Sequence, residues 1–175
     1  MATFVQRMVG AAKLDVHTYE EVEADTTALG QSLGVVVLSS LAAGVSAGHG
    51  VRGLVVGSVA ALLGWFVWAF VTYFIGTKLL PEPQTKSDVG ELLRTTGFAS
   101  SPGILRVFGF VPMLGWLLGI ITAVWMLVAM VVAVRQALDY TSTGRAIGVC
   151  LIGWLALVLI TMVLGGMTVG ALGMG

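Results

Sequence analysis

The sequence predicts an all-α membrane protein with several transmembrane helices. Hydrophobic residues make up 57% of its 175 residues and charged residues only 10%, whereas ordinary soluble domains carry about 25% charged residues. The charges are also unevenly distributed, so that long runs of the chain contain none. A soluble globule of this composition would expose large apolar patches. The lipid bilayer is therefore the solvent that fits this chain.

Three charge-free runs are each long enough to cross the hydrocarbon core of a membrane, which takes about 20 apolar residues. These runs predict transmembrane helices over residues 26–48, 53–77 and 146–172. The connection between the first two is very short, so we expect those helices to be antiparallel neighbours.

Residues 95–138 contain Pro102 and Pro112 and permit two interpretations. In one, the protein has four transmembrane helices, and the first part of this region is a short segment that lies at the membrane interface without crossing it. In the other, a short third span covers residues 95–111, Pro112 begins a turn, and the fourth span covers residues 113–138. With the N-terminus in the cytoplasm, five spans place seven Lys and Arg residues inside and two outside, against six and three for four spans. Because positive charge accumulates on the cytoplasmic side, we expect five spans, a short third helix and a cytoplasmic N-terminus.

Residues 1–25 are expected to form a segment distinct from the transmembrane domain at residues 26–175. Their apolar residues recur at near-helical spacing, which predicts an amphipathic helix lying along the cytoplasmic interface. This helix is expected to break near Leu14–Asp15. Thr18, followed by Glu21, resembles a capping box that starts a helix leading into the first span.

The largest predicted loop covers residues 78–94. Pro81 and Pro83 end the second span, because proline cannot continue a helix without losing a hydrogen bond. Asp88 and Glu91 form a second capping signal, which predicts a helix beginning within this loop.

Glycines four residues apart place small side chains on one helix face, where backbones can approach closely. Within one chain such faces hold a bundle together, and between chains they form oligomers; both uses remain open here. The glycines expected on such faces are Gly30, Gly34, Gly53, Gly57, Gly115, Gly119, Gly166 and Gly170.

Four charged residues are candidates for contact with lipid headgroups or with a partner. Arg106 lies inside the predicted short span, where a charge costs about 2.5–3.5 kcal/mol; its side chain is expected to reach headgroup phosphates, and a substrate or ion site is the alternative. Arg135 and Asp139 are four residues apart and can pair. With Arg145, they are expected to form a polar cluster at the inner membrane surface. This cluster would anchor the helices at the interface or bind the 78–94 loop.

No pattern in the sequence predicts catalysis, a cofactor or a metal. Cys150 has no histidine near it in the sequence, and His17 with Glu20 and Glu21 is expected to be a solvated helix face rather than a metal site. There is no nucleotide-binding motif. The formal net charge is zero, whereas nucleic-acid binding needs a basic patch. We therefore expect a protein that is not an enzyme.

Residues 91–149 resemble the Yip1 domain family in the order of their parts. "ELLR" precedes "TGFASSP", a short apolar helix and "P-x-L-G-W"; a long helix then ends in "AVRQAL-D", and "GRAIGV" opens the last helix. The resemblance implies five spans and a cytoplasmic N-terminus. Eukaryotic relatives act in traffic between the endoplasmic reticulum and the Golgi and bind Rab-type small GTPases or sibling family members. Here the region before the first span is only 25 residues long and lacks a "DLYGP"-type motif, so the chain is similar to the compact prokaryotic form, and GTPase binding would follow only by analogy.

These observations predict a membrane scaffold, lipid-contacting protein or accessory subunit. Its expected partners are membrane lipids, other membrane proteins or further copies of itself. Its expected location is the prokaryotic cytoplasmic membrane or, for a eukaryotic chain, the endoplasmic reticulum or Golgi. The alternative is a small transporter or channel that uses the broken helix around Pro102–Pro112, since interrupted helices build binding sites in transporters.

Overall fold

The described part of the protein is all-helical. The computed structural model describes residues 2–111 and 113–172, and the surroundings of side chains up to Met162. Within these ranges there are seven α-helices, two 3₁₀ segments, one π segment and no β-strand. The elements are α1 Phe4–Ala12, α2 Val16–Ala24, η1 Thr26–Ala28, α3 Leu29–Ser46, α4 Val51–Phe74, η2 Ile75–Leu79, α5 Val89–Phe98, η3 Ser101–Phe110, α6 Leu114–Ala137 and α7 Thr143–Leu172.

Four helical segments are long and apolar enough to cross a membrane. They are Thr26–Ser46, Val51–Leu79, Leu114–Ala137 and Thr143–Met162. The first three coincide, within a few residues, with predicted spans, and the fourth begins three residues before the span predicted at 146–172 and extends to Met162, the last residue whose surroundings are described. The second segment stops at Leu79, just before Pro81, as expected.

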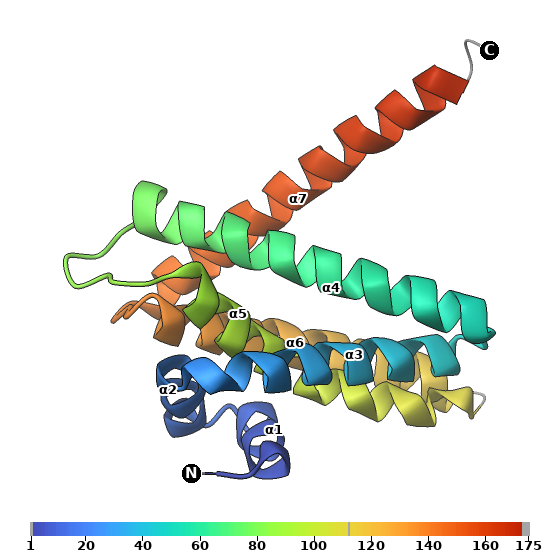
Figure 1. The fold of residues 1–175 in the computed structure, drawn as a ribbon, viewed down its shortest axis with the longest axis horizontal. Helices are drawn as coiled ribbons and strands as arrows, with labels where there is room; N and C mark the ends of the chain where they lie inside the picture. Colours follow the sequence, from blue (N-terminus) through green and yellow to red (C-terminus); the bar gives the residue numbers. More distant parts are fainter. Residues whose placement is uncertain (1, 112, 173–175) are drawn as a thin grey trace.

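The bundle has two different ends along its long axis (Figure 1). Helices α1 and α2, the loop between η2 and α5, and the connection between α6 and α7 gather at one end, which we call the N-terminal end. The α3–α4 connection and the start of α6 lie at the other, which we call the distal end. The two clusters of buried hydrophobic residues include residues of α2, α5 and the second half of α6, so the core lies toward the N-terminal end.

The N-terminal segment forms two helices joined by a sharp turn. Leu14 adopts a positive φ of 63°, and the Asp15 side chain caps α2 by accepting a hydrogen bond from the His17 amide at 3.2 Å. The break predicted near Leu14–Asp15 is therefore confirmed. The capping box expected at Thr18 is wrong, because Asp15 takes the cap position and also accepts a hydrogen bond from the Thr18 hydroxyl.

A buried arginine fastens this segment to the first long helix. Arg7 is only 2% exposed. Its Nη2 lies 2.9 Å from Glu21 and 2.7 Å from Asp25, and its Nη1 donates to Gln31 of α3 at 3.0 Å. Hydrogen bonds from Thr27 and from Arg7 lower the pKa of Asp25 to about 2.

The segment expected as one short helix over residues 95–111 is instead an α-helix followed by a 3₁₀-helix. Helix α5 begins with the predicted capping box, in which Asp88 accepts from the Glu91 amide at 2.8 Å and Glu91 accepts from the Asp88 amide at 3.0 Å. Pro102 occupies one of the first two positions of η3, where its missing N–H costs no hydrogen bond. Pro112, the predicted start of the turn, lies outside the described residues.

Helix α3 and the α5–η3 segment pack through serines that face glycines. In each pair, a Cβ added to the glycine would collide with the serine side chain. The serines are seven residues apart, two α-helical turns, and the glycines are six apart, which from Gly103 to Gly109 is two turns of 3₁₀-helix. The pairs are Ser32 with Gly97, Ser39 with Gly103, and Ser46 with Gly109. Since both residue numbers rise together, the two segments run in the same direction.

Helix α7 leaves the bundle. Near its start it packs on α4, where a Cβ at Gly153 would lie 3.3 Å from Trp68, and it also contacts η2 and α6. Figure 1 shows α7 diverging from α4 along its length. The four residues from Leu159 to Met162 are all exposed.

Candidate functional site

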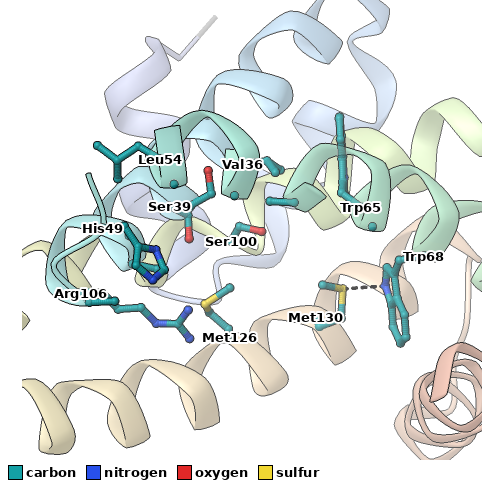
Figure 2. A pocket seen from close by; sticks show the side chains of 18 of the residues that line it. Val36, Ser39, His49, Leu54, Trp65, Trp68, Ser100, Arg106, Met126 and Met130 are labelled. Atoms are coloured by element: carbon teal, nitrogen blue, oxygen red, sulfur yellow. Dashed lines mark hydrogen bonds between the residues drawn. The ribbon is translucent and has the colours of Figure 1, made fainter. Parts of the chain in front are cut away.

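A cavity of about 730 Å³ lies between α3, α4, η3 and α6, with one residue from α7 in its wall (Figure 2). Figure 2 shows Arg106 and His49 at one end of it, Trp65 and Trp68 toward the other, and Met126 between them. Most of the lining is apolar, and its described residues include no acidic side chain. The cavity therefore combines an apolar interior with a cationic end.

Arg106 is the one lining residue whose side chain carries a permanent charge. It lies in η3, and its Nε donates a hydrogen bond to the Thr122 hydroxyl of α6 at 2.9 Å. Thr122 is fully buried and donates its own proton to the Leu118 carbonyl at 2.6 Å. This chain of bonds orients the guanidinium. Among the ion pairs of the described residues, none involves Arg106.

The 3₁₀ winding of η3 brings Arg106 to the cavity. A Cβ at Gly103 would collide with Ser39 of α3 and would lie 2.9 Å from the Met126 sulfur of α6. Glycine at this position therefore lets η3 fit between α3 and α6. Arg106, one 3₁₀ turn later, is thereby held between the same two helices.

Glycines also form the α4 wall of the cavity. Gly53, Gly57 and Gly64 line it. No atom lies within 4 Å of a Cβ added at Gly57 or Gly64. The space beside α4 is therefore open for a long, flexible group.

The other glycines predicted on packing faces have different surroundings. A Cβ at Gly115 would collide with the Gly109 carbonyl, and one at Gly53 would lie 3.0 Å from His49, whereas Gly34 has a single neighbour at 3.8 Å. A Cβ at Gly30 or Gly119 meets nothing within 4 Å. Gly166 and Gly170 lie in α7, but their surroundings fall outside the described side chains.

The three other charged candidates lie together at the N-terminal end. Arg135 donates to the Tyr140 and Thr141 carbonyls at 3.2 and 3.3 Å. The expected pairing with Asp139 on one helix face is wrong, because α6 ends at Ala137 and Asp139 adopts a φ of 53° in the following turn.

Arg145 binds the loop that follows η2. It donates to the Pro81 carbonyl at 2.7 Å and lies 3.6 Å from Glu82. Glu82 is only 8% exposed and accepts hydrogen bonds from Thr141 and from the Ser142 amide. These contacts hold the loop against the α6–α7 connection, and we call them the Glu82 clasp.

Sequence reasoning did not identify Thr122, Glu82 or His49 as members of these sites. Thr122 is one of several hydroxyl residues in apolar runs, and only the fold brings it to Arg106. Glu82 lies in the predicted 78–94 loop, where a carboxylate is normally solvated, so its position between Pro81 and Pro83 did not mark it as a partner of Arg145.

Nothing in the described residues indicates a metal centre. They contain no group of three His, Cys, Asp or Glu side chains able to hold an ion. His17 lies 3.4 Å from Glu20 on an exposed helix face.

One of the comparisons with known proteins identifies a family. A sequence model of the Yip1 domain matches residues 22–165, which is most of the chain. No curated protein sequence matches significantly, and neither does any solved structure. Together with the long apolar helices, the family match makes this an integral membrane protein with a helical bundle. The chain belongs to the Yip1 domain family.

Proposed function

We propose that the protein is a non-enzymatic membrane scaffold whose helix α7 packs against another membrane protein or a second copy of this chain. The observation that carries the proposal is the exposure of α7 on all sides over the turn from Leu159 to Met162. Leu159, Ile160 and Met162 are 63%, 41% and 68% exposed, and Thr161 between them is exposed as well. Four consecutive residues cover a full helical turn, so no face of α7 is covered there by the described part of the bundle.

The sequence beyond this turn supplies a packing face. Gly166 and Gly170 are four residues apart in the same helix. Small residues at this spacing let helices approach closely in lipid, where packing rather than the hydrophobic effect drives association. A helix that leaves its own bundle and carries such a face is suited to a partner.

The proposal includes five passes through the membrane. The serine–glycine contacts place the α5–η3 segment alongside α3 from Ser32 to Ser46, a distance of about 21 Å. A 3₁₀-helix rises about 2.0 Å per residue against 1.5 Å for an α-helix, so the ten residues of η3 reach about 5 Å further than an α-helix would. A segment too short to cross as an α-helix gains reach in this way.

We place the N-terminal end in the cytoplasm, with residues 1–25 as an interfacial segment. Most of the basic residues of the chain, among them Arg7, Lys86 and Arg145, belong to elements at this end, which follows the positive-inside rule. The prokaryotic cytoplasmic membrane is the location we propose, with the endoplasmic reticulum or Golgi for a eukaryotic chain. Small-GTPase binding is not included, because it rests on analogy alone.

Partner packing is tested by enlarging the α7 face. The double variant Gly166→Leu and Gly170→Leu, purified from native membranes in mild detergent, should lose a partner or homo-oligomer that the wild type retains in stoichiometric amount. Ala60→Leu, on the exposed side of α4, is the matched control and should retain it. A wild type recovered only as a monomer, or a double variant that keeps its partner, would contradict the proposal.

The topology is tested with single cysteines in a Cys150→Ala background. Five passes place Lys86→Cys and Gly144→Cys on the same side of the membrane, and Gly50→Cys on the other. All three positions are exposed, so a membrane-impermeant maleimide can reach them. Labelling of Lys86→Cys and Gly144→Cys from opposite sides would show four passes.

A second candidate function is a small transporter or channel. The observation favouring it is the break between α5 and η3, beside a cavity with a cationic end. This function would be supported if proteoliposomes containing the wild type take up anions and those containing Arg106→Ala do so more slowly. Flux that is absent, or unchanged by the substitution, would remove it.

A further inference from the structure

We propose that the cavity beside Arg106 binds one anionic phospholipid, with its phosphate on the Arg106 guanidinium and an acyl chain along the glycine wall of α4. The site uses the open cavity between α3, α4, η3 and α6 rather than the packing face of α7. A negative result for this lipid site therefore would not affect the partner proposed for that helix, and the reverse also holds.

The first step is the uncompensated charge. A cation at membrane depth costs about 2.5–3.5 kcal/mol, and buried charges are normally paired. Arg106 is partly buried, and the hydrogen bond described for it uses Nε alone. Its terminal amino groups are thus available for an anion.

The second step is the orientation of these groups. Thr122 holds Nε at 2.9 Å, which restrains the orientation of the guanidinium. Figure 2 shows Arg106 and His49 at the same end of the cavity, with Ser39 nearby. Guanidinium groups bind phosphate through parallel hydrogen bonds in one plane, so a preoriented Arg106 suits a phosphate oxygen pair.

The third step is the shape and chemistry of the rest of the cavity. Its α4 wall runs from Gly53 to Trp68, about 22 Å along the helix, which exceeds one leaflet's share of a hydrocarbon core about 30 Å thick. Gly57 and Gly64 leave space beside the backbone, and Met130 and Leu157 add flexible apolar surface. A free phosphate would leave this apolar volume empty, whereas the tail of a lipid fills it.

Native mass spectrometry of the detergent-purified full chain, titrated with dioleoyl-phosphatidylglycerol, tests the site. The wild type should retain one lipid that resists dissociation, and Arg106→Met should bind it at least about tenfold more weakly, the loss of one charge-assisted contact. Arg52→Met is the matched control and should bind as the wild type does, because Arg52 is exposed at the start of α4 and does not line the cavity.

Two further arms identify the source of the phosphate and guard against misfolding. Gly64→Leu fills the tail region without touching Arg106, and should weaken lipid binding while an unchanged thermal transition shows an intact fold. Inorganic phosphate alone should bind far more weakly than the lipid. Wild-type affinity in Arg106→Met or Gly64→Leu would overturn the proposal. So would equal affinity for dioleoyl-phosphatidylcholine, or binding of inorganic phosphate as tight as that of the lipid.

Discussion

Two arginines on one segment show how the ends of this bundle differ. Arg94 in α5 is 6% exposed, and its guanidinium donates to the backbone carbonyls of Val22 and Glu23, with Nε 3.0 Å from each. Arg106, twelve residues later in η3, donates through Nε to Thr122 alone. At the N-terminal end, Arg94 is satisfied by backbone carbonyls, whereas at the distal end the terminal amino groups of Arg106 have no hydrogen-bond partner among the described residues.

The two ends also differ in how tightly their residues pack: the N-terminal end is densely packed and the distal end is not. Around Arg94, every residue from Leu92 to Ala99 is buried. Beside Arg106, the helices leave an open cavity of about 730 Å³ between them. The contrast suggests that the N-terminal end supplies stability and the distal end supplies binding, and substitutions can test this division.

The largest expected effect is that of Arg94→Met. It leaves the Val22 and Glu23 carbonyls without their donor, and hydrogen bonds to charged groups contribute about 1.5–3 kcal/mol each. We therefore expect a loss of about 3 kcal/mol in unfolding free energy, measured by thermal or SDS titration in lipid-free micelles. Arg106→Met is the control and should change stability by less than about 1 kcal/mol, because the loss of its one hydrogen bond is offset by removal of a partly buried charge that has no ion partner among the described residues. Equal losses in both variants would abolish the distinction between the two ends.

The next effect concerns the close contact between η3 and its neighbours. Gly103→Ala places a Cβ against Ser39 and 2.9 Å from the Met126 sulfur, and overpacking of this kind costs about 1–3 kcal/mol. Gly119→Ala is the matched control: its Cβ meets no atom within 4 Å, so it should be neutral or stabilising by up to about 1 kcal/mol, as expected for alanine in a helix. The same unfolding titration measures both. A Gly103→Ala variant as stable as Gly119→Ala would show that η3 can shift away from α3.

The sequence was sufficient to predict the long helices and the capped start of α5. Charge-free runs located α3, α4, α6 and α7 to within a few residues, because the length of a span is set by the thickness of the bilayer. Asp88 and Glu91 located the beginning of α5, because capping depends on neighbours three residues apart.

The distal cavity could not be predicted in this way. Glycines of the 3₁₀-helix η3 meet serines more than sixty residues away in the chain, and spacing rules based on α-helical turns do not anticipate such contacts. The Arg106–Thr122 contact depends on the same packing. Likewise, Arg135 and Asp139 have the spacing of a helical pair, but α6 ends before Asp139.

A smaller effect is expected at Glu23, at the N-terminal end. Burial, followed by repulsion from Glu91 and Asp139, raises the pKa of Glu23 to about 7. Since the folded state holds its proton more tightly than the unfolded state, stability is full below about pH 4.5 and falls as pH rises through about 7. Glu23→Gln should thus stabilise the protein at about pH 8, by about 1 kcal/mol at most because solvent screens this half-buried group, and should have no effect near pH 4. An equal difference at both pH values would show that charge is not the cause.

The smallest expected effect is local and concerns the Glu82 clasp. Hydrogen bonds from the Thr141 amide and hydroxyl, with others from Gln84 and Ser142, lower the pKa of Glu82 to about 2. The unfolded state therefore binds the proton more readily, so the clasp contributes fully above about pH 4.5 and is lost as pH falls toward about 2. Amide hydrogen exchange, corrected for intrinsic exchange rates, measures this effect. At about pH 7, the Thr141 and Ser142 amides should be less protected in Glu82→Gln than in the wild type. Wild type and variant should converge near pH 2, with the buried Ala129 amide of α6 protected equally in both throughout. Unchanged protection at about pH 7 would mean that Arg145 and the Pro81 carbonyl hold the loop without the carboxylate, and that the N-terminal end depends less on its charges than Arg94 suggests.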